Sequence, residues 1–192
     1  MRLRAVSAMP HLADPRCFSV VAAAVGDSDR LVREVAGHAL IAIDSLRAGD
    51  LLAAVSGGID RPIVERADAL TALRALPTVT TTAWTAVVDC LGDPENHVRG
   101  AALGTAAALA ARPGIWWRKV SDIALAGVSS DDPYRREISL ALARQLNAPG
   151  YLRHCRLTLN DPHPMVRDRA RHELMVPPRR RWWQHQNRPY DR

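Results

Sequence analysis

Apolar residues recur along this chain with the period of an α-helix. From Leu31 onward they are separated by three or four residues, as in Val32, Val35, Ala36, Ala39, Leu40 and Ile43, a spacing that places them on one helical face. Similar segments begin near Ile63, Val98, Tyr134 and Met165, and each follows a shorter apolar segment. No segment alternates apolar and polar residues in the manner of a β-strand. The pattern therefore predicts an all-α fold made of paired helices.

The paired segments belong to an internal repeat. An Asp is followed by an Arg six residues later and by a small residue nine residues later, as in Asp27/Arg33/Ala36, Asp60/Arg66/Ala69, Asp93/Arg99/Ala102 and Asp161/Arg167/Ala170. A further unit is expected at Asp131-Asp132, where position +6 is Glu137 or Ile138, so that this fourth unit lacks the Arg. The recurrence of this Asp-Arg-small pattern along the chain is typical of a repeat protein.

Each unit is interpreted as two helices joined at the Asp. The first helices are expected within 17–25, 51–55, 80–91, 115–125 and 151–159. The turn Asp can cap the second helix, and the small residue at +9 allows neighbouring helices to approach closely. Cys17, Cys90 and Cys155 share one helical face in this register, and we expect them to be buried apolar groups.

The Asp-x5-Arg pattern resembles the short HEAT-like repeats of the phycobilin-lyase type. The resemblance implies an α-α superhelix, or solenoid, of about five helical hairpins over residues 16–176. Residues 1–15 then form a partial N-terminal cap, and residues 177–192 a basic tail. It also implies a structural ladder of charge-assisted hydrogen bonds between adjacent repeats, made by Asp27, Arg33, Asp60, Arg66, Asp93, Arg99, Asp161 and Arg167.

Charge is unevenly distributed along the 192 residues. Residues 1–100 contain 10 basic and 12 acidic side chains, whereas residues 101–192 contain 16 and 8. Three cysteines without CxxC spacing argue against disulfides or a zinc site, and no apolar run is long enough to span a membrane. We therefore expect a reduced, cytoplasmic protein that binds no membrane.

Candidate binding residues come from the second helices, which are expected to form the concave face of the solenoid. Positions +4, +7 and +11 from the turn Asp should face outward there. The charged and histidine members of this set are Glu34, His38, His97, Asp168 and His172, whereas the middle of the face is small and smooth, with Val64, Ala67, Thr71, Gly100 and Gly104. Glu34/His38 and Asp168/His172 are i,i+4 pairs, which we interpret as solvated pairs rather than metal ligands. No cofactor is expected.

Tryptophans and arginines supply a second set of candidates. Trp116 and Trp117 begin a helix, and because adjacent residues point in different directions, at least one of them should be partly exposed. The pair either packs the seam between repeats or forms a partner-binding edge. The tail contains Arg179, Arg180, Arg181, Trp182 and Trp183. Arginines beside aromatics suit docking on the end of the solenoid, an acidic protein groove or single-stranded nucleic acid.

Enzymes built from HEAT-like repeats fit the sequence poorly. Deoxyhypusine hydroxylases use repeated His-Glu dipeptides, and this chain has one, His172-Glu173. The HEAT-like alkylpurine DNA glycosylases combine tryptophans with an Asp, but Trp84 and Asp89 lie off one helical face. No Gly-rich phosphate loop, HExxH or GxSxG occurs, and nothing specifies a tetrapyrrole pocket.

The leading hypothesis is a non-enzymatic scaffold that binds another macromolecule, most simply a protein, through its concave face and basic C-terminal end. The alternative is a nucleic-acid-binding protein related to the alkylpurine DNA glycosylases. A third hypothesis is a lyase-like accessory protein for a small hydrophobic ligand, which requires an enclosed pocket.

Overall fold

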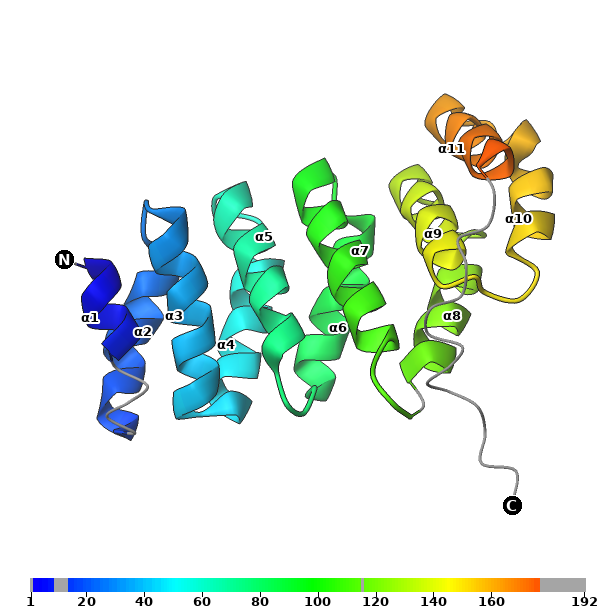
Figure 1. The fold of residues 1–192 in the computed structure, drawn as a ribbon. Coiled ribbons are helices and arrows are strands. Elements are labelled where there is room, and N and C mark those ends of the chain that lie inside the picture. Colours follow the sequence, from blue (N-terminus) through cyan, green and yellow to red (C-terminus); the bar gives the residue numbers. More distant parts are fainter. Residues whose placement is uncertain (1, 9–13, 115, 177–192) are drawn as a thin grey trace, which may run out of the picture. The chain divides into compact units, whose positions relative to one another are not determined.

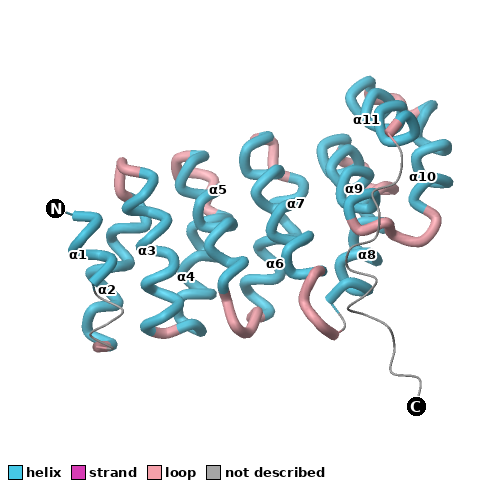
Figure 2. Tube along the Cα trace, in the orientation of Figure 1, coloured by secondary structure: helices cyan, strands magenta, loops and turns pink. Residues whose placement is uncertain are grey.

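The fold is an all-α solenoid, as the sequence pattern predicts. The computed structural model describes residues 2–8, 14–114 and 116–176, and every regular element in these ranges is helical (Figures 1 and 2). The α-helices are α1 (Arg2–Ala8), α2 (Phe18–Ala23), α3 (Arg30–Ile43), α4 (Ser45–Gly57), α5 (Ile63–Ala72), α6 (Thr81–Asp89), α7 (Asn96–Ala110), α8 (Trp116–Gly127), α9 (Pro133–Gln145), α10 (Tyr151–Leu157) and α11 (Pro164–Met175). Short 3-10 turns extend α2, α5, α6 and α10. The second helices of the five hairpins, α3, α5, α7, α9 and α11, begin within two residues of the predicted positions.

The described residues form two compact units. The N-terminal unit comprises the described residues up to Cys90 together with Glu95–Thr105, and the C-terminal unit comprises Leu91–Pro94 and the described residues from Ala106 onward. In the N-terminal unit, α1, α3 and α5 pack side by side as one layer, and α4 packs against α6 in the other (Figure 1). In the C-terminal unit, α9 packs between α8 and α11, and α10 completes the last hairpin.

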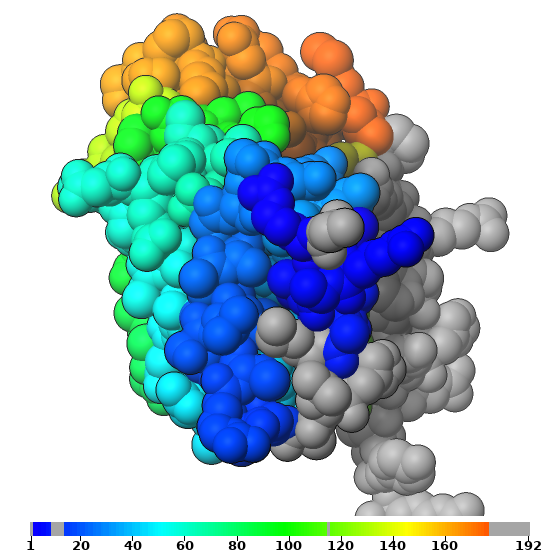
Figure 3. Space-filling model, turned by 90° about the vertical axis from the view of Figure 1, so that its left-hand side faces the viewer, coloured from blue at the N-terminus to red at the C-terminus, as the bar shows by residue number. Residues whose placement is uncertain are grey.

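Helix α1 covers the first hairpin. It packs against α3, and its Val6 is buried. Figure 3 shows the helix, in dark blue, on the surface at this end of the chain. In the sequence, this helix falls within the segment predicted as the N-terminal cap.

Small residues allow the helices to approach closely, as the repeat predicts. The alanines at position +9, namely Ala36, Ala69, Ala102 and Ala170, are at most 1% exposed. At Gly37 of α3, an added Cβ would lie 2.7 Å from Cβ of Ala72. A side chain at residue 37 would therefore push α3 and α5 apart.

In the first and fifth hairpins the turn Asp does not cap the second helix, whereas in the fourth hairpin Asp132 caps α9 by accepting from N–H of Tyr134 and Arg135. In the first hairpin the cap is Asp29, whose carboxylate accepts from N–H of Leu31, while Asp27 accepts from N–H of Asp29 at 2.8 Å. Asp161 likewise accepts from N–H of His163 at 2.9 Å. In these two hairpins the expected cap is wrong, because the turn Asp lies two residues before the helix cap and instead closes the turn itself.

The repeated Arg binds the backbone of that turn. Nη1 of Arg33 donates to the carbonyls of Asp27 and Ser28, and Nη1 of Arg167 donates to those of Asp161 and Pro162, all at 2.7–3.1 Å. The guanidinium thus supplies donors to carbonyl groups that the turn leaves outside any helix.

The fourth hairpin contains this Arg after all, which corrects the sequence prediction. Nη1 of Arg136 donates to the carbonyls of Ser130 and Asp131 at 2.8 and 2.9 Å. Ser130 is the turn residue six positions earlier, and its Oγ accepts from N–H of Asp132 at 3.3 Å. A search for Asp misses this unit because Ser offers the same carbonyl and a side-chain acceptor.

The side-chain partners differ along the expected ladder. Arg136 binds the carboxylate of Asp161 in the next hairpin, but Arg33 binds Asp68 of α5 at 2.8 Å. Asp60 is exposed and has no ion pair within the described part of the chain. Nε of Arg66 donates to the carbonyl of Ser56 at 3.0 Å.

Arg99 and Asp93, the remaining ladder residues, are both buried. Nη2 of Arg99 donates to Oδ1 of Asn96 at 3.4 Å.

Two of the three cysteines are buried. Cys155 is fully enclosed and Cys90 is 3% exposed, whereas Cys17 at the start of α2 is half-buried. The prediction of three buried thiols is wrong at Cys17, because this residue lies in the turn of 3-10 helix that leads into α2.

Candidate binding grooves on the second helices

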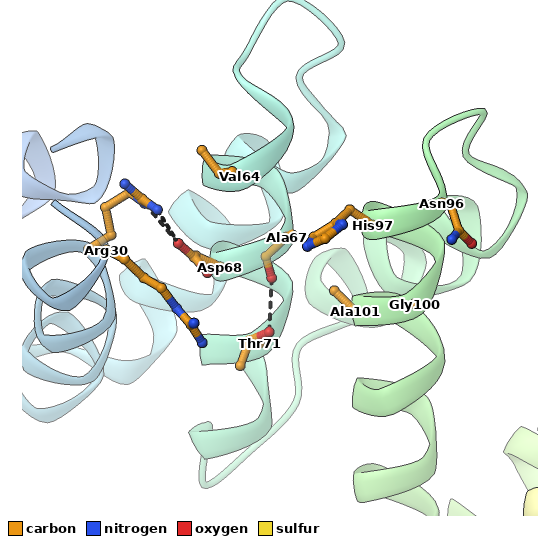
Figure 4. A pocket seen from close by; sticks show the side chains of 10 residues that line it. Arg30, Val64, Ala67, Asp68, Thr71, Asn96, His97, Gly100 and Ala101 are labelled. Carbon is orange, nitrogen blue, oxygen red and sulfur yellow. Dashed lines mark hydrogen bonds and ion pairs between the residues drawn. The ribbon is translucent and has the colours of Figure 1, made fainter. Parts of the chain in front are cut away.

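The N-terminal unit has a groove across its second helices. Its volume is about 450 Å³, and α3, α5 and α7 supply the residues that line it (Figure 4). They are Arg30, Arg33, Val64, Ala67, Asp68, Thr71, Asn96, His97, Gly100 and Ala101. Because each of these helices is the second of its hairpin, all three begin at the same edge of the layer (Figure 2).

The centre of the groove is lined by small groups. Ala67 is 7% exposed, and an added Cβ on Gly100 would meet no atom within 4 Å. Val64 stands beside them with half of its surface exposed. The groove therefore offers apolar surface and free space, which larger side chains at these positions would occupy.

Charged groups lie at the α3 side of the groove. Arg33 is 6% exposed, and both Nε and Nη2 reach Oδ2 of Asp68 at 2.8 Å. Arg30 is exposed and forms no ion pair with any described residue. His97 is also exposed, and its ring points across the groove toward Ala67 (Figure 4). The groove thus contains one neutralised guanidinium and one that is free.

The groove contains part of the predicted surface. His97 lines it together with four apolar or small members of the predicted positions, but Glu34 and His38 are exposed on α3 and do not line it. The sequence did not predict four of the lining residues. Arg30 and Asn96 lie at +3 from a turn Asp, and Asp68 and Ala101 lie at +8, so the repeat register contained a signal for them.

A second groove lies in the C-terminal unit, with a volume of about 500 Å³. It is lined by Glu137 of α9 and by Pro164, Met165, Asp168, Arg169 and His172 of α11. The predicted pair Asp168 and His172 therefore borders one groove, although Asp168 pairs with Arg171 at 2.9 Å. Arg169 was not predicted, and it binds Glu137 at 2.5 Å.

A buried charge network supports this second groove. Glu173 is 2% exposed and lies 2.9 Å from Nε of Arg144 and 3.4 Å from Nη1 of Arg169. Burial raises the pKa of the neighbouring Tyr151 phenol. Burial, and then the charge of Glu173, raise the pKa of the Cys155 thiol to about 11. With Glu137, which also binds Arg169, the network holds two positive and two negative side chains, and these pairs link α9 to α11.

The tryptophan candidates are partly enclosed. Trp117 donates from Nε1 to the carbonyl of Leu146 at 3.2 Å, and the ammonium of Lys119 lies 5.1 Å from the ring centre of Trp116. Both rings are half-buried. Trp84 is 8% exposed within α6, so it does not present a stacking surface beside Asp89. Arg179, Arg180, Arg181, Trp182 and Trp183 lie outside the described residues.

A third hollow lies on the other layer of the N-terminal unit. It measures about 560 Å³ between α4 and α6 and is lined by alanines, threonines and Gly57, with Asp50 and Asp89 among them. No group of three or more potential metal ligands occurs among the described residues. In that same part of the chain, no helix is both long enough and apolar enough to cross a membrane.

Comparisons with known proteins found similar solved structures but no relative by sequence. No protein-family model matches the sequence, and no curated protein matches it. An engineered protein is similar in structure over 90% of this chain and 88% of its own, with 14% identity and a TM-score of 0.46. Human deoxyhypusine hydroxylase in complex with glycerol is similar over 90% of this chain and 66% of its own, with 16% identity and a TM-score of 0.45. A designed armadillo repeat protein is similar over 90% of both chains, with 15% identity and a TM-score of 0.44.

Proposed function

We propose that this chain is a non-enzymatic repeat scaffold that binds a segment of another protein in the groove formed by α3, α5 and α7. The observation behind the proposal is the groove itself, where the free Arg30 and the exposed Val64 flank a small-residue centre. Repeat proteins bind partners along surfaces made by successive units. A groove that crosses three helices suits an extended chain.

The character of the lining favours a macromolecule over a small hydrophobic ligand. Val64, Thr71 and His97 are all exposed, so their side chains border the groove without enclosing it. Small-molecule sites bury most of their ligand in a concave pocket. An accessory role for an enclosed hydrophobic ligand is therefore the weaker proposal.

The basic C-terminal segment is proposed as a second contact for the partner. Its three consecutive arginines, Arg179 to Arg181, would add electrostatic attraction to an acidic partner. Nucleic acid remains the competing partner class, because arginines beside tryptophans also suit phosphate and base contacts.

A pair of matched substitutions tests the groove. Gly100→Leu fills the groove, and Gly57→Leu places the same side chain in the hollow between α4 and α6, and neither added Cβ meets an atom within 4 Å. The tagged full chain and both variants are used to purify bound proteins from native extract, with and without nuclease treatment, with quantification by mass spectrometry.

We expect to recover a protein that binds the parent chain and Gly57→Leu but does not bind Gly100→Leu. Loss from Gly57→Leu instead would assign binding to the other hollow. Equal retention by all three chains would contradict the proposed groove. Nuclease-sensitive binding would favour nucleic acid as the partner.

A further inference from the structure

We infer that the segment bound in this groove is acidic, with an Asp or Glu carboxylate on Arg30 and an apolar side chain on Val64. The inference rests on the proposed function, since it names the chemistry of the partner for the same groove. It follows from the charges, donors and apolar surface that α3, α5 and α7 present.

Arg30 is the first requirement for an anionic partner. Asp68 is the carboxylate within the groove, and both Nε and Nη2 of Arg33 already bind it at 2.8 Å. Arg30 is exposed and has no ion pair among the described residues. A carboxylate from the partner can therefore form a bidentate pair with Arg30 without displacing an existing contact.

The start of α5 is the helix terminus that adds to this preference. α3, α5 and α7 begin at Arg30, Ile63 and Asn96 on one edge of the groove, but the carboxylate of Asp29 already caps α3. The end of α5 has no side-chain cap, because its N-cap residue is Pro62. Oδ1 of Asn96 accepts from Arg99, which leaves the Asn96 amide N–H groups as donors.

The apolar part of the groove selects against a simple polyanion. Val64 is 50% exposed and lines the same groove as Gly100, where an added Cβ would meet open space. A partner side chain of Leu or Val size would cover Val64 and gain apolar burial. Nucleic acid, in contrast, requires several cations along its phosphates, and Arg30 is the lone unpaired guanidinium among the described lining residues.

The arrangement also sets the length of the bound segment. Packed helices lie about 8–10 Å apart, so a chain that crosses three helices spans roughly 16–20 Å. At about 3.3 Å per residue this corresponds to roughly five or six extended residues. A linear peptide therefore suffices as a probe.

The test is a selection of random eight-residue displayed peptides on the full chain. The recovered sequences are synthesised with a fluorophore, and their affinities are measured by fluorescence polarisation against the parent chain, Arg30→Glu and Gly100→Leu. Arg153→Glu is the matched control, because Arg153 is an exposed arginine of α10 that lies far from the groove in sequence and has no ion pair within the described ranges. Unchanged circular dichroism confirms that each variant folds.

We expect peptides with at least one Asp or Glu beside an apolar residue. Their Kd should rise about tenfold or more in Arg30→Glu, because attraction becomes repulsion, and stay unchanged in Arg153→Glu. Two results would overturn this inference and leave the proposed function intact. The peptides weakened by Gly100→Leu could lack acidic residues, or their Kd could be unchanged in Arg30→Glu. If no recovered peptide binds more weakly to Gly100→Leu than to the parent chain, both this inference and the proposed function are overturned.

Discussion

Arg136 and Asp161 join the last two hairpins through two parallel hydrogen bonds. Nε and Nη2 of Arg136 donate to Oδ2 and Oδ1 of Asp161 at 2.8 and 2.9 Å, and the third nitrogen, Nη1, binds the turn carbonyls of its own hairpin. One guanidinium thus closes a turn and fixes the next repeat. Its side chain is 12% exposed, and that of Asp161 is 7% exposed.

Replacement of Arg136 should therefore destabilise the C-terminal unit. Arg136→Ala removes two of the donors to the Asp161 carboxylate and the donor to two turn carbonyls, so we expect a loss of about 2–3 kcal/mol. Arg153→Ala, an exposed arginine on α10, is the control and should change stability by less than about 0.5 kcal/mol. Urea unfolding measures both. Equal stability of the two variants would show that the pair contributes nothing.

The same pair predicts a pH dependence. The hydrogen bonds from Arg136 lower the pKa of the Asp161 carboxyl below its usual value. A carboxyl with a lowered folded pKa contributes stability above its unfolded pKa of about 4, and loses it as the pH falls through the folded value. The stability difference between the parent chain and Asp161→Asn should therefore be largest near neutral pH and shrink below about pH 4. A difference that grows on acidification would contradict the assignment.

Two glycines should respond oppositely to alanine. Gly37→Ala places a Cβ 2.7 Å from that of Ala72, so we expect a destabilisation of about 1–2 kcal/mol despite the better helix propensity. Gly100→Ala meets open space and should stabilise by about 0.5–1 kcal/mol. Thermal unfolding of the two variants compares them directly. A stabilising Gly37→Ala would mean that α3 and α5 are not in close contact.

Thiol reactivity should separate the three cysteines. Cys155 is enclosed and has a pKa of about 11, so its thiolate fraction near neutral pH is very small. Cys90 is also buried, whereas Cys17 is half-buried. Titration with a chromogenic disulfide at pH 8 should detect one thiol that reacts quickly and two that react after denaturation. Rapid reaction in a Cys17→Ser variant would indicate that the core around α6 or α10 opens.

The buried network around Glu173 gives a further stability prediction. Glu173→Gln leaves Arg144 and Arg169 short of a buried counter-charge, so a loss of about 3 kcal/mol is expected. The double variant Arg144→Leu/Glu173→Leu should recover part of it, because the isolated charge on Arg144 is removed together with its partner. Denaturant unfolding of both variants provides the comparison. A double variant that is less stable than Glu173→Gln would show that the charges stabilise the unit directly.

Much of the fold could be predicted from the chain alone. Helical periodicity located five second helices, and the alanines at +9 proved to be buried because the repeat requires close packing at that position. The hydrogen bonds of the turns were harder to predict. Arg136 was overlooked because its turn begins with Ser130, and a backbone carbonyl accepts a hydrogen bond whatever side chain it belongs to.

The candidate site was predicted only in part, because its border depends on helix packing. His97 and its neighbours on α5 and α7 were placed on one face by the repeat register. Glu34 and His38 share that face but lie beyond the groove, since its border depends on how α3 and α5 pack.

By itself, the sequence determined that this protein is an all-α repeat of paired helices, because local hydrophobic periodicity suffices for that. The tertiary structure decided which charges remain free. Arg33 and Arg30 are three residues apart on one helix, yet Asp68, 35 residues beyond Arg33 in the sequence, neutralises Arg33 and leaves Arg30 exposed. That choice depends on the packing of α3 against α5, which no local pattern in the chain encodes.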